Sequence, residues 1–441
     1  MFNLIGTLKN IATRFPSIMA MVWRMHFAKE LAAHRKRIQP YRAQGDQKKH
    51  DYVVETALLI GYFEVNLGLG EYARGLATAL EAAGLPFSIY PYNAYTGRLR
   101  NEAPWARLYD VDEAHSVNIF CMAPNQTKNA RRIIGRRHTE KSYNILSTFW
   151  ELQHAPESWR SDLDFFDELW APNHFVANSF RQIFSKRILI MPPCVDVGVD
   201  ITPNRAKFGL DPTKFYFVFS FDRNSYIERK NPLAVANAFS IAFDDGRDDV
   251  GLIFKLSGSQ NPFPKTTLEL EAIAARDRRI AILQGDWQRA DVLALMASVD
   301  CFVSLHRSEG FGLGMAEAMF LGKPVIGTAF SGNTDFLTGE TGYPVPYQMR
   351  AVEQGEYPYS AGNSWAEPDV RIAAEMMRSV ASRTDEVRSK ALRGQSYVKQ
   401  HYSPKAVGRV VAARLRELTG GASSSAKPIS TSINAHGLKT R

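Results

Sequence analysis

Two glutamates eight residues apart, Glu309 and Glu317, have the type and spacing of ligand-binding side chains. They lie in residues 300–328, DCFVSLHRSEGFGLGMAEAMFLGKPVIGT, where an apolar run, a Gly-rich loop, a helical segment and a second apolar run predict a βαβ unit. Glycines and free backbone N–H groups at a helix start form an anion site. A carboxylate beside such a site would instead accept hydrogen bonds from hydroxyls. A ligand with both phosphate and hydroxyls, such as a sugar nucleotide, would use both features.

The surroundings of these glutamates argue against the plain alternative of two solvated surface acids. Glu317 is flanked by Met and Ala residues on both sides, so its segment is apolar. Glu309 precedes the Gly-Phe-Gly run of residues 310–312, a loop that allows a ligand to approach closely. We therefore expect both carboxylates to bind a ligand.

A basic pair, Arg229 and Lys230, lies between a predicted strand and a helix that begins near Pro232. Ligands of parallel sheets bind at the carboxyl ends of the strands, so both cations would face the same cleft as the glutamates. There they would stabilise the negative charge that develops on a departing nucleoside diphosphate. An exposed basic turn is the alternative, and Arg223 is a second candidate for the arginine.

The sequence G-x-G-x-x-A at Gly68, Gly70 and Ala73 follows the first predicted strand. An NAD site would need an acid at the end of the next strand, and residues 88–95 offer none, so NAD is disfavoured. We expect the two glycines to bring backbone N–H groups to a phosphate across the cleft. A tight strand–helix turn is the alternative.

No metal ion is expected. D-x-D pairs occur at Asp110–Asp112 and Asp162–Asp164, but neither follows a convincing buried strand, so chance explains them better. The three cysteines include no C-x-x-C pair, which disfavours a zinc site and a disulfide framework.

The elements that must position these residues form two α/β series, in residues 51–200 and 201–402. Alternating strands and helices predict parallel sheets covered on both faces. We therefore expect an α/β fold of two doubly wound Rossmann-like domains facing each other across a cleft, followed by an amphipathic helix over residues 403–419. The predicted strands are Ala57–Tyr62, Phe87–Tyr90, Val117–Cys121, Tyr143–Phe149, Glu168–Ala171, Ile188–Met191, Phe215–Ser220, Val250–Lys255, Ile280–Leu283, Cys301–Leu305 and Val325–Gly327.

The net charge of +9 on 441 residues is concentrated in the two ends. Residues 1–50 hold ten Lys and Arg against two acids, and residues 420–441 hold three and none, so the body is slightly acidic. This disfavours a nucleic-acid partner, which needs a basic face on the folded domain. The first segment also contains apolar residues and predicts a partly helical arm that binds an anionic membrane surface. A solvated arm, or a helix packed on the body, is the alternative. The composition of residues 420–441 predicts a disordered tail.

With these residues in place, the chain resembles the retaining GT-B glycosyltransferases of family 4 (glycosyl transferases group 1). Residues 309–317 are similar to the E-x7-E signature of that family. Four more stretches agree in order, and the likeness covers about residues 55 to 415: GYFEVNLGLGEYARGLATALEAAG (61–84), FWELQHAPESW (149–159), DELWAPNHFV (167–176) and IERKNPLAVANAF (227–239).

The resemblance implies roles for residues of the second, donor-binding domain. Glu309 would contact the donor sugar and support charge at its anomeric carbon, and Glu317 would bind the ribose. Arg229 and Lys230 would hold the diphosphate. Backbone N–H groups would come from Gly310, Phe311, Gly312 and Leu313.

The first domain would bind the acceptor, and Gly68 and Gly70 would close on the diphosphate from that side. The helix over residues 403–419 would cross back onto this first domain. Many members have a His after the fourth strand, where this chain has Trp150 and Glu151. No His role transfers, and the role of Glu151 is left open.

The activity implied is retaining transfer of a hexosyl group from a nucleoside diphosphate sugar to a glycan or lipid-linked glycan acceptor in polysaccharide biosynthesis. It would need neither metal nor cofactor. GDP-mannose is one candidate donor, and UDP sugars stay open. The expected location is the cytoplasm, peripherally on the inner face of the cytoplasmic membrane. A sugar-nucleotide epimerase on the same scaffold and a non-catalytic sugar-nucleotide-binding protein are the alternatives.

Overall fold

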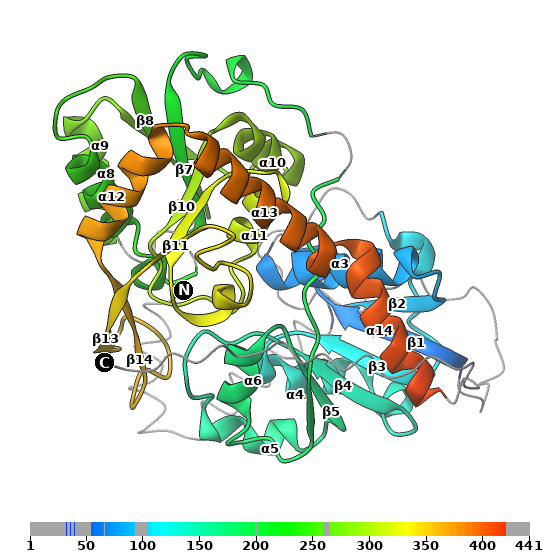
Figure 1. Ribbon diagram of the computed structural model, residues 1–441. Helices are drawn as coiled ribbons and strands as arrows, with labels where there is room; N and C mark the ends of the chain where they lie inside the picture. Colours follow the sequence, from blue (N-terminus) through cyan, green and yellow to red (C-terminus); the bar gives the residue numbers. More distant parts are fainter. Residues whose placement is uncertain are drawn as a thin grey trace.

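The computed structural model describes residues 54–65, 67–92, 104–198, 201–223, 225–258 and 264–419, and the single residues 32, 36 and 39. The arm predicted over residues 1–50 and the tail predicted over residues 420–441 lie outside the described residues, apart from those three positions. The described part forms two α/β domains, one blue to green and the other green to orange in Figure 1.

The first domain is built on a parallel six-stranded sheet of order β2-β1-β3-β4-β5-β6. Strand β1 lies between β2 and β3, and its residues Leu58, Leu59 and Ile60 are fully buried. This burial is expected for a parallel sheet covered on both faces. The strands are β1 (Val54–Gly61), β2 (Phe87–Pro91), β3 (His115–Cys121), β4 (Tyr143–Ser147), β5 (Glu168–Ala171) and β6 (Arg187–Ile190). The helices are α3 (Gly68–Ala82), α4 (Thr127–Ile134), α5 (Arg160–Leu163) and α6 (His174–Phe180).

The second domain repeats this plan with a sheet of order β12-β11-β10-β7-β8-β9. Its strands are β7 (Phe215–Asp222), β8 (Val250–Ser257), β9 (Ile280–Gln284), β10 (Cys301–Ser304), β11 (Val325–Thr328) and β12 (Tyr343–Val345). Its helices are α7 (Ile227–Lys230), α8 (Pro232–Ala242), α9 (Pro264–Arg276), α10 (Arg289–Ser298), α11 (Leu313–Phe320) and α12 (Val370–Ala381). Single 3-10 turns complete the two domains: Ala106–Leu108, Pro124–Gln126, Arg136–His138, Glu157–Trp159, Ala206–Phe208 and Ser331–Asp335.

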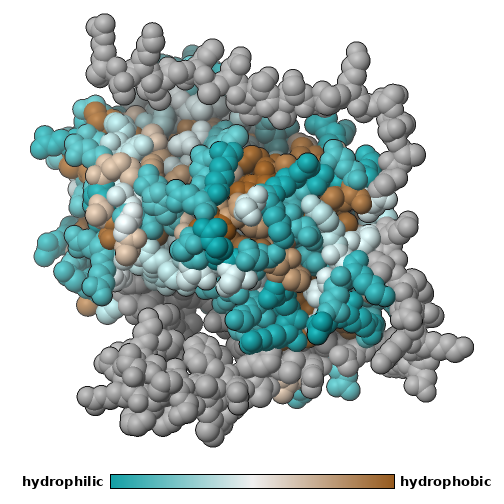
Figure 2. Space-filling view, turned by 90° about the horizontal axis from the view of Figure 1, so that it is seen from below, coloured by the Kyte–Doolittle hydropathy of each residue, from teal (hydrophilic) through white to brown (hydrophobic). Residues whose placement is uncertain are grey.

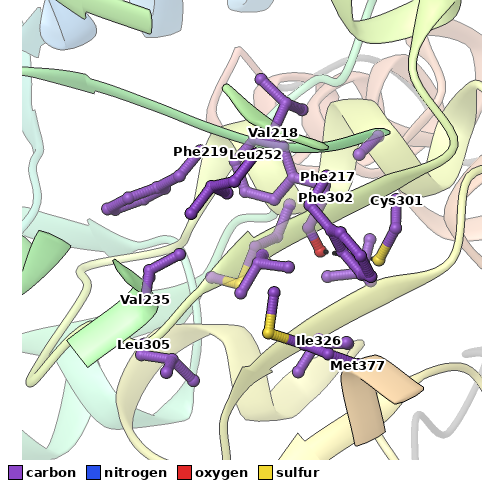
Figure 3. Close-up of a cluster of buried hydrophobic side chains, with 14 of the residues drawn as sticks. Phe217, Val218, Phe219, Val235, Leu252, Cys301, Phe302, Leu305, Ile326 and Met377 are labelled. Atoms are coloured by element: carbon purple, nitrogen blue, oxygen red, sulfur yellow. Dashed lines mark hydrogen bonds between the residues drawn. The ribbon is translucent and has the colours of Figure 1, made fainter. Parts of the chain in front are cut away.

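The core of the second domain lies where the central strands meet the covering helices. The strands of the sheet supply many of its side chains, and helices α8, α9, α10, α11 and α12 supply others. Helix α8 begins at a proline, and α12 is capped by Asp369. The side chains labelled in Figure 3 include Phe217, Val218, Phe219, Leu252, Phe302, Ile326, Val235 and Met377.

The C-terminal helices link the domains. In Figure 1, α13 (Asp385–Tyr402) runs along the second domain, and α14 (Pro404–Leu418) continues onto the first, beside α3. A side chain at Gly408 would meet the carbonyl oxygen of Ala79 at 2.3 Å, so the two helices touch backbone to backbone. Arg414 forms an ion pair with the fully buried Glu168 of β5. The predicted GT-B fold, with two Rossmann-like domains and a helix that crosses back, is therefore confirmed.

Strand β12 and one hairpin of the second domain were not predicted. The antiparallel hairpin of β13 (Tyr347–Ala351) and β14 (Ser364–Pro368) leaves the second domain, and its loop reaches the first. Tyr357 and Trp365 are buried in an apolar cluster that also contains Trp150 of the first domain. The sequence does not predict the hairpin, because β13 is mostly exposed and lacks the apolar pattern of a core strand.

The molecular surface shows mixed polarity. Figure 2 shows hydrophobic residues near the centre of the lower face, with hydrophilic ones around them. Within the described ranges, no helix has the length and apolar character needed to span a membrane. The exposed large apolar side chains belong to several different elements: Ile241, Leu268, Tyr347, Met349, Tyr359, Leu392 and Val410.

Candidate active site

A cavity of about 410 Å³ lies between the two domains, where the carboxyl ends of both sheets face each other. Such a volume is typical of a site for a small-molecule ligand. Most of its lining comes from segments that follow β1, β4, β7, β9 and β10. They supply Gly68, Glu71, Tyr72, Phe149, Glu151, Arg229, Lys230, Arg289, Glu309, Gly310, Gly312 and Leu313.

Glu309 is held in the loop between β10 and α11 by the turn that follows β11. Its backbone N–H donates to the hydroxyl of Ser331 at 2.8 Å, and its carbonyl oxygen accepts from the N–H of Gly332 at 2.9 Å. Gly312 caps α11 with a φ of 89°, which is accessible to glycine at little cost. The glycines of this loop therefore shape the backbone that places the carboxylate.

The basic pair predicted from the sequence meets Glu309 directly. The ammonium of Lys230 lies 2.5 Å from Oε1 of Glu309, and Nη1 of Arg229 lies 3.1 Å from Oε2. The α7 turn places both cations, and Nη1 of Arg229 also donates to the carbonyl oxygen of Ser308 at 2.8 Å. Burial raises the pKa of Glu309, but Lys230 and Arg229 outweigh it and lower the pKa to about 2. The carboxylate is therefore ionised at neutral pH.

The alternative arginine lies elsewhere. Arg223 donates from Nε to the carbonyl oxygen of Gly258 at 3.1 Å, at the end of β8, and does not line the cavity. Arg229 is thus the arginine that the structure brings to Glu309.

Glu317 itself does not line the cavity, and it pairs with a residue that the sequence did not single out. Nη2 of Arg289 lies 2.7 Å from Oε1 of Glu317, and Nε of the same arginine lies 3.6 Å from Oε2 of Glu71 in the first domain. Nη2 also donates to the carbonyl oxygen of Asp196, at 2.8 Å. Burial raises the pKa of Glu317, and Arg289 opposes this rise. The strand-end rule could have found Arg289, because it begins the helix after β9.

The two predicted glycines of the first domain behave differently. Helix α3 begins at Gly68, so the G-x-G run forms its first turn and not a loop before it. Gly68 lines the cavity, and a Cβ there would meet nothing within 4 Å. A Cβ at Gly70 would lie 2.5 Å from the carbonyl oxygen of Val65, and Gly70 does not line the cavity. The missing side chain of Gly70 therefore serves packing, and its contact with a ligand stays a prediction.

The loop after Glu309 brings all four of its predicted residues to the cavity. Gly310, Gly312 and Leu313 line the cavity, as does Phe311, but the ring of Phe311 packs against Phe336 and Tyr402. Only the backbone of Phe311 is therefore suited to meet a ligand.

Two residues of the first domain reach the same loop. The amide of Asn173, which caps α6, donates to the carbonyl oxygen of Gly310 at 2.6 Å. Glu151 lines the cavity, and Oε2 of its carboxylate accepts a hydrogen bond from the hydroxyl of Tyr357 at 2.7 Å. Asn173 was missed because a capping asparagine after a strand has no feature of its own that signals a contact in another domain.

The D-x-D pairs do not reach the cavity. Asp110 accepts from the backbone N–H groups of Asp112 and Glu113, both at 3.0 Å, and lies 3.2 Å from Nε2 of His115. Burial raises the pKa of Asp110, but these hydrogen bonds lower it to about 2. The second pair belongs to the short helix α5 and its end. Among the described residues, no group of three or more His, Cys, Asp or Glu side chains is arranged to hold a metal ion.

Comparison with known proteins agrees with this architecture. Residues 219–354 match the family model described as glycosyl transferases group 1. A segment of 68 residues, 15% of this chain, is 41% identical to trehalose synthase of Pyrococcus horikoshii. The match covers 16% of the length of that relative.

Solved structures share the fold over most of the chain. An Anabaena HepE structure in complex with UDP and glucose has a TM-score of 0.57 at 15% identity, covering 82% of this chain and all of that one. Sucrose-phosphate synthase from Thermosynechococcus elongatus has a TM-score of 0.58 at 16% identity, covering 83% and 100%. A glycosyltransferase from Rickettsia africae has a TM-score of 0.58 at 15% identity, covering 84% and 100%. At such identities the likeness shows the fold alone. The chain therefore has the GT-B fold and resembles the glycosyl transferases of group 1, whose sequence pattern lies in its second domain.

Proposed function

We propose that the chain is a retaining glycosyltransferase that moves a hexosyl group from a nucleoside diphosphate sugar to a glycan or lipid-linked glycan acceptor. The observation that carries this proposal is the contact of Lys230 and Arg229 with Glu309 in a cavity lined by both domains. Two cations suit a diphosphate, and an ionised carboxylate suits sugar hydroxyls. Few ligand classes need both within one small cavity.

In the proposed reaction, the bond between the anomeric carbon and the diphosphate oxygen breaks. The acceptor oxygen bonds to that carbon from the same face, and its proton passes to the leaving phosphate. Arg229 and Lys230 stabilise the charge of the departing diphosphate, while Glu309 supports positive charge at the sugar. Backbone N–H groups at the start of α11 add to the anion site. Glu317, which pairs with Arg289 of the cavity lining, is proposed to contact the ribose.

Turnover assays with a donor panel test this proposal. We expect release of nucleoside diphosphate from UDP-glucose or GDP-mannose when a glycan acceptor is present, and NMR of the product should show the anomeric configuration of the donor. The proposed reaction needs no metal, so EDTA should leave the rate unchanged. Glu309→Ala should abolish most turnover, and an unchanged rate would remove Glu309 from the mechanism.

Two alternatives are separated by the same assays. Interconversion of the donor sugar without an acceptor would indicate an epimerase. Binding of a sugar nucleotide without turnover with any acceptor would indicate a non-catalytic binding protein. A thermal-shift screen with GDP, UDP and ADP identifies the base, because a bound ligand raises the apparent stability.

We further propose a peripheral location on the inner face of the cytoplasmic membrane. Residues 1–50 carry ten Lys and Arg against two acids, and an anionic lipid surface attracts such a segment. The full chain should sediment with phosphatidylglycerol vesicles but not with phosphatidylcholine vesicles. A chain that starts at residue 51 should lose this binding, and equal binding by both chains would contradict the proposal.

A further inference from the structure

Glu151 approaches the ionised cluster from the opposite domain. It follows β4 in the first domain and lines the same cavity as Glu309 of the second. The hydroxyl of Ser308, which directly precedes Glu309, donates to the carbonyl oxygen of Glu151. The charge of Glu151 also acts on Arg229, whose pKa is lowered by burial but raised more by Glu309 and Glu151. The two acidic residues are therefore neighbours that come from different domains.

Tyr357 holds the carboxylate of Glu151 in place. Its hydroxyl donates to Oε2 of Glu151 at 2.7 Å. Tyr357 is 7% exposed, and its ring packs against Tyr226 and Trp150 at centroid distances of 4.8 and 5.8 Å. A carboxylate has about four acceptor sites on two oxygens, so the bond to Tyr357 leaves Glu151 able to accept further hydrogen bonds. Because Glu151 lines the cavity, a bound ligand can supply the donor.

Charge decides what kind of ligand group meets Glu151. A diphosphate would be drawn to Arg229 and Lys230, and a second carboxylate would repel it. A neutral hydroxyl is attracted to a carboxylate and forms a strong hydrogen bond with it. Glu151 lines the same cavity as Glu309, the carboxylate proposed to contact the donor sugar, and its backbone contacts Ser308, the residue before Glu309. The hydroxyls of that sugar are thus the groups that fit.

We propose that Glu151 is a second carboxylate that binds a hydroxyl of the donor hexosyl group, and that Tyr357 is the residue that positions it. The proposal rests on the proposed function, since it requires a sugar nucleotide in the cavity. It assigns donor-sugar selection to both domains, because Glu309 of the second domain and Glu151 of the first would each bind the sugar.

Equilibrium binding to the full chain tests the proposal without an acceptor. Calorimetry compares UDP with UDP-glucose and GDP with GDP-mannose for the parent, Glu151→Gln and Tyr357→Phe. The expected result for Glu151→Gln is a fall of about tenfold in affinity for the sugar nucleotide relative to the bare nucleotide, since a charged acceptor becomes neutral. Tyr357→Phe should also lower the affinity for the sugar nucleotide relative to that for the bare nucleotide. Glu375→Gln, on the exposed side of α12, is the matched control and should leave the ratio unchanged.

Each other outcome counts against the proposal. Equal weakening of both ligands by Glu151→Gln would show a structural role only, and an unchanged ratio with slower transfer would place Glu151 on the acceptor. Thermal unfolding reveals whether Glu151→Gln folds. If it does not, Tyr357→Phe replaces it, and an unchanged ratio of affinities for sugar nucleotide and bare nucleotide in that variant overturns the proposal. A parent protein that binds none of the four ligands contradicts the proposed function itself, which separates that failure from a failure of Glu151.

Discussion

The side-chain amide of Asn173 in the first domain donates a hydrogen bond to the carbonyl oxygen of Gly310 in the second, at 2.6 Å. The same amide reaches the carbonyl oxygen of Gly332 at 3.2 Å, and its oxygen caps α6 by accepting from the N–H of Val176. Asn173 is fully buried. One residue of the first domain therefore holds both backbone segments that surround Glu309.

Asn173→Asp should lower the transfer rate but keep the side-chain cap of α6. The aspartate keeps the oxygen that caps the helix, but it replaces the donor to Gly310 with an acceptor. We expect a loss of about 1–3 kcal/mol in unfolding free energy from the unpaired carbonyl. Displacement of the loop should lower the transfer rate at least about tenfold. Urea unfolding and steady-state kinetics measure the two effects, with Asn173→Ala as the variant that also loses the cap. Parent-like kinetics of Asn173→Asp would contradict this role.

The stabilising effect of ionised Glu309 should disappear at low pH. Its pKa in the folded chain is about 2, below its ordinary value of 4.5, so its contribution is complete above pH 4.5 and is lost as the pH falls toward 2. The shift corresponds to about 3 kcal/mol. We expect the difference in unfolding free energy between the parent and Glu309→Gln to shrink over that interval in urea titrations. A difference that does not depend on pH would contradict the ion pair.

Gly68→Ala and Gly70→Ala form a matched pair two residues apart in the first turn of α3. A Cβ at Gly68 meets nothing within 4 Å, so Gly68→Ala should leave the unfolding temperature unchanged or slightly raised. Because Gly68 lines the cavity, the same change should weaken nucleoside diphosphate binding. Gly70→Ala should lower the unfolding temperature, since its Cβ would lie 2.5 Å from a backbone oxygen. Thermal unfolding and calorimetry separate the two positions, and the reverse pattern would contradict the assignment.

The bridge from Arg289 to Glu317 should appear as an energetic coupling. Glu317 is buried, so Arg289→Gln leaves it unpaired, and Glu317→Gln leaves the cation without its nearest partner. A double-mutant cycle of unfolding free energies should give a coupling of about 1–3 kcal/mol. The exposed pair of Lys207 and Asp291 at 2.5 Å is the control and should give less than about 1 kcal/mol. Equal couplings for the two pairs would show that burial adds nothing to the bridge.

Much of the fold was predictable because local patterns and global architecture agree. Runs such as Leu58–Ile60 are apolar on both faces, and this is the pattern of a parallel strand covered by helices. Strand β13 carries no such pattern, since most of its side chains are exposed, and it was missed. The hairpin exists because its loop, with Tyr357, packs on the other domain, and a contact of that kind has no local signal.

The candidate site divides in the same way. Glu309 and the basic pair were found because glycines, charges and strand ends lie close together in the sequence. Arg289 begins the helix after β9, so the strand-end rule could have indicated it, but its pairing with Glu317 has no signal in the sequence. Asn173 was not found, because a capping asparagine is an ordinary feature until another segment lies against it. Glycine permits close approach by any group, and at Gly70 the sequence does not reveal that the carbonyl oxygen of Val65 is such a group.

By itself, the sequence determined the strand and helix pattern, the two-domain plan and the residues around Glu309, because burial periodicity and helix-start chemistry act over short stretches of chain. Only the tertiary structure decided which charges meet: Lys230 and Arg229 on Glu309, Arg289 on Glu317 and Glu71, and Tyr357 on Glu151. These pairings depend on how two separate sheets and one hairpin pack across the cavity. Coulomb and hydrogen-bond energies depend on the distance between the groups in space. The spacing of the residues along the chain does not give that distance.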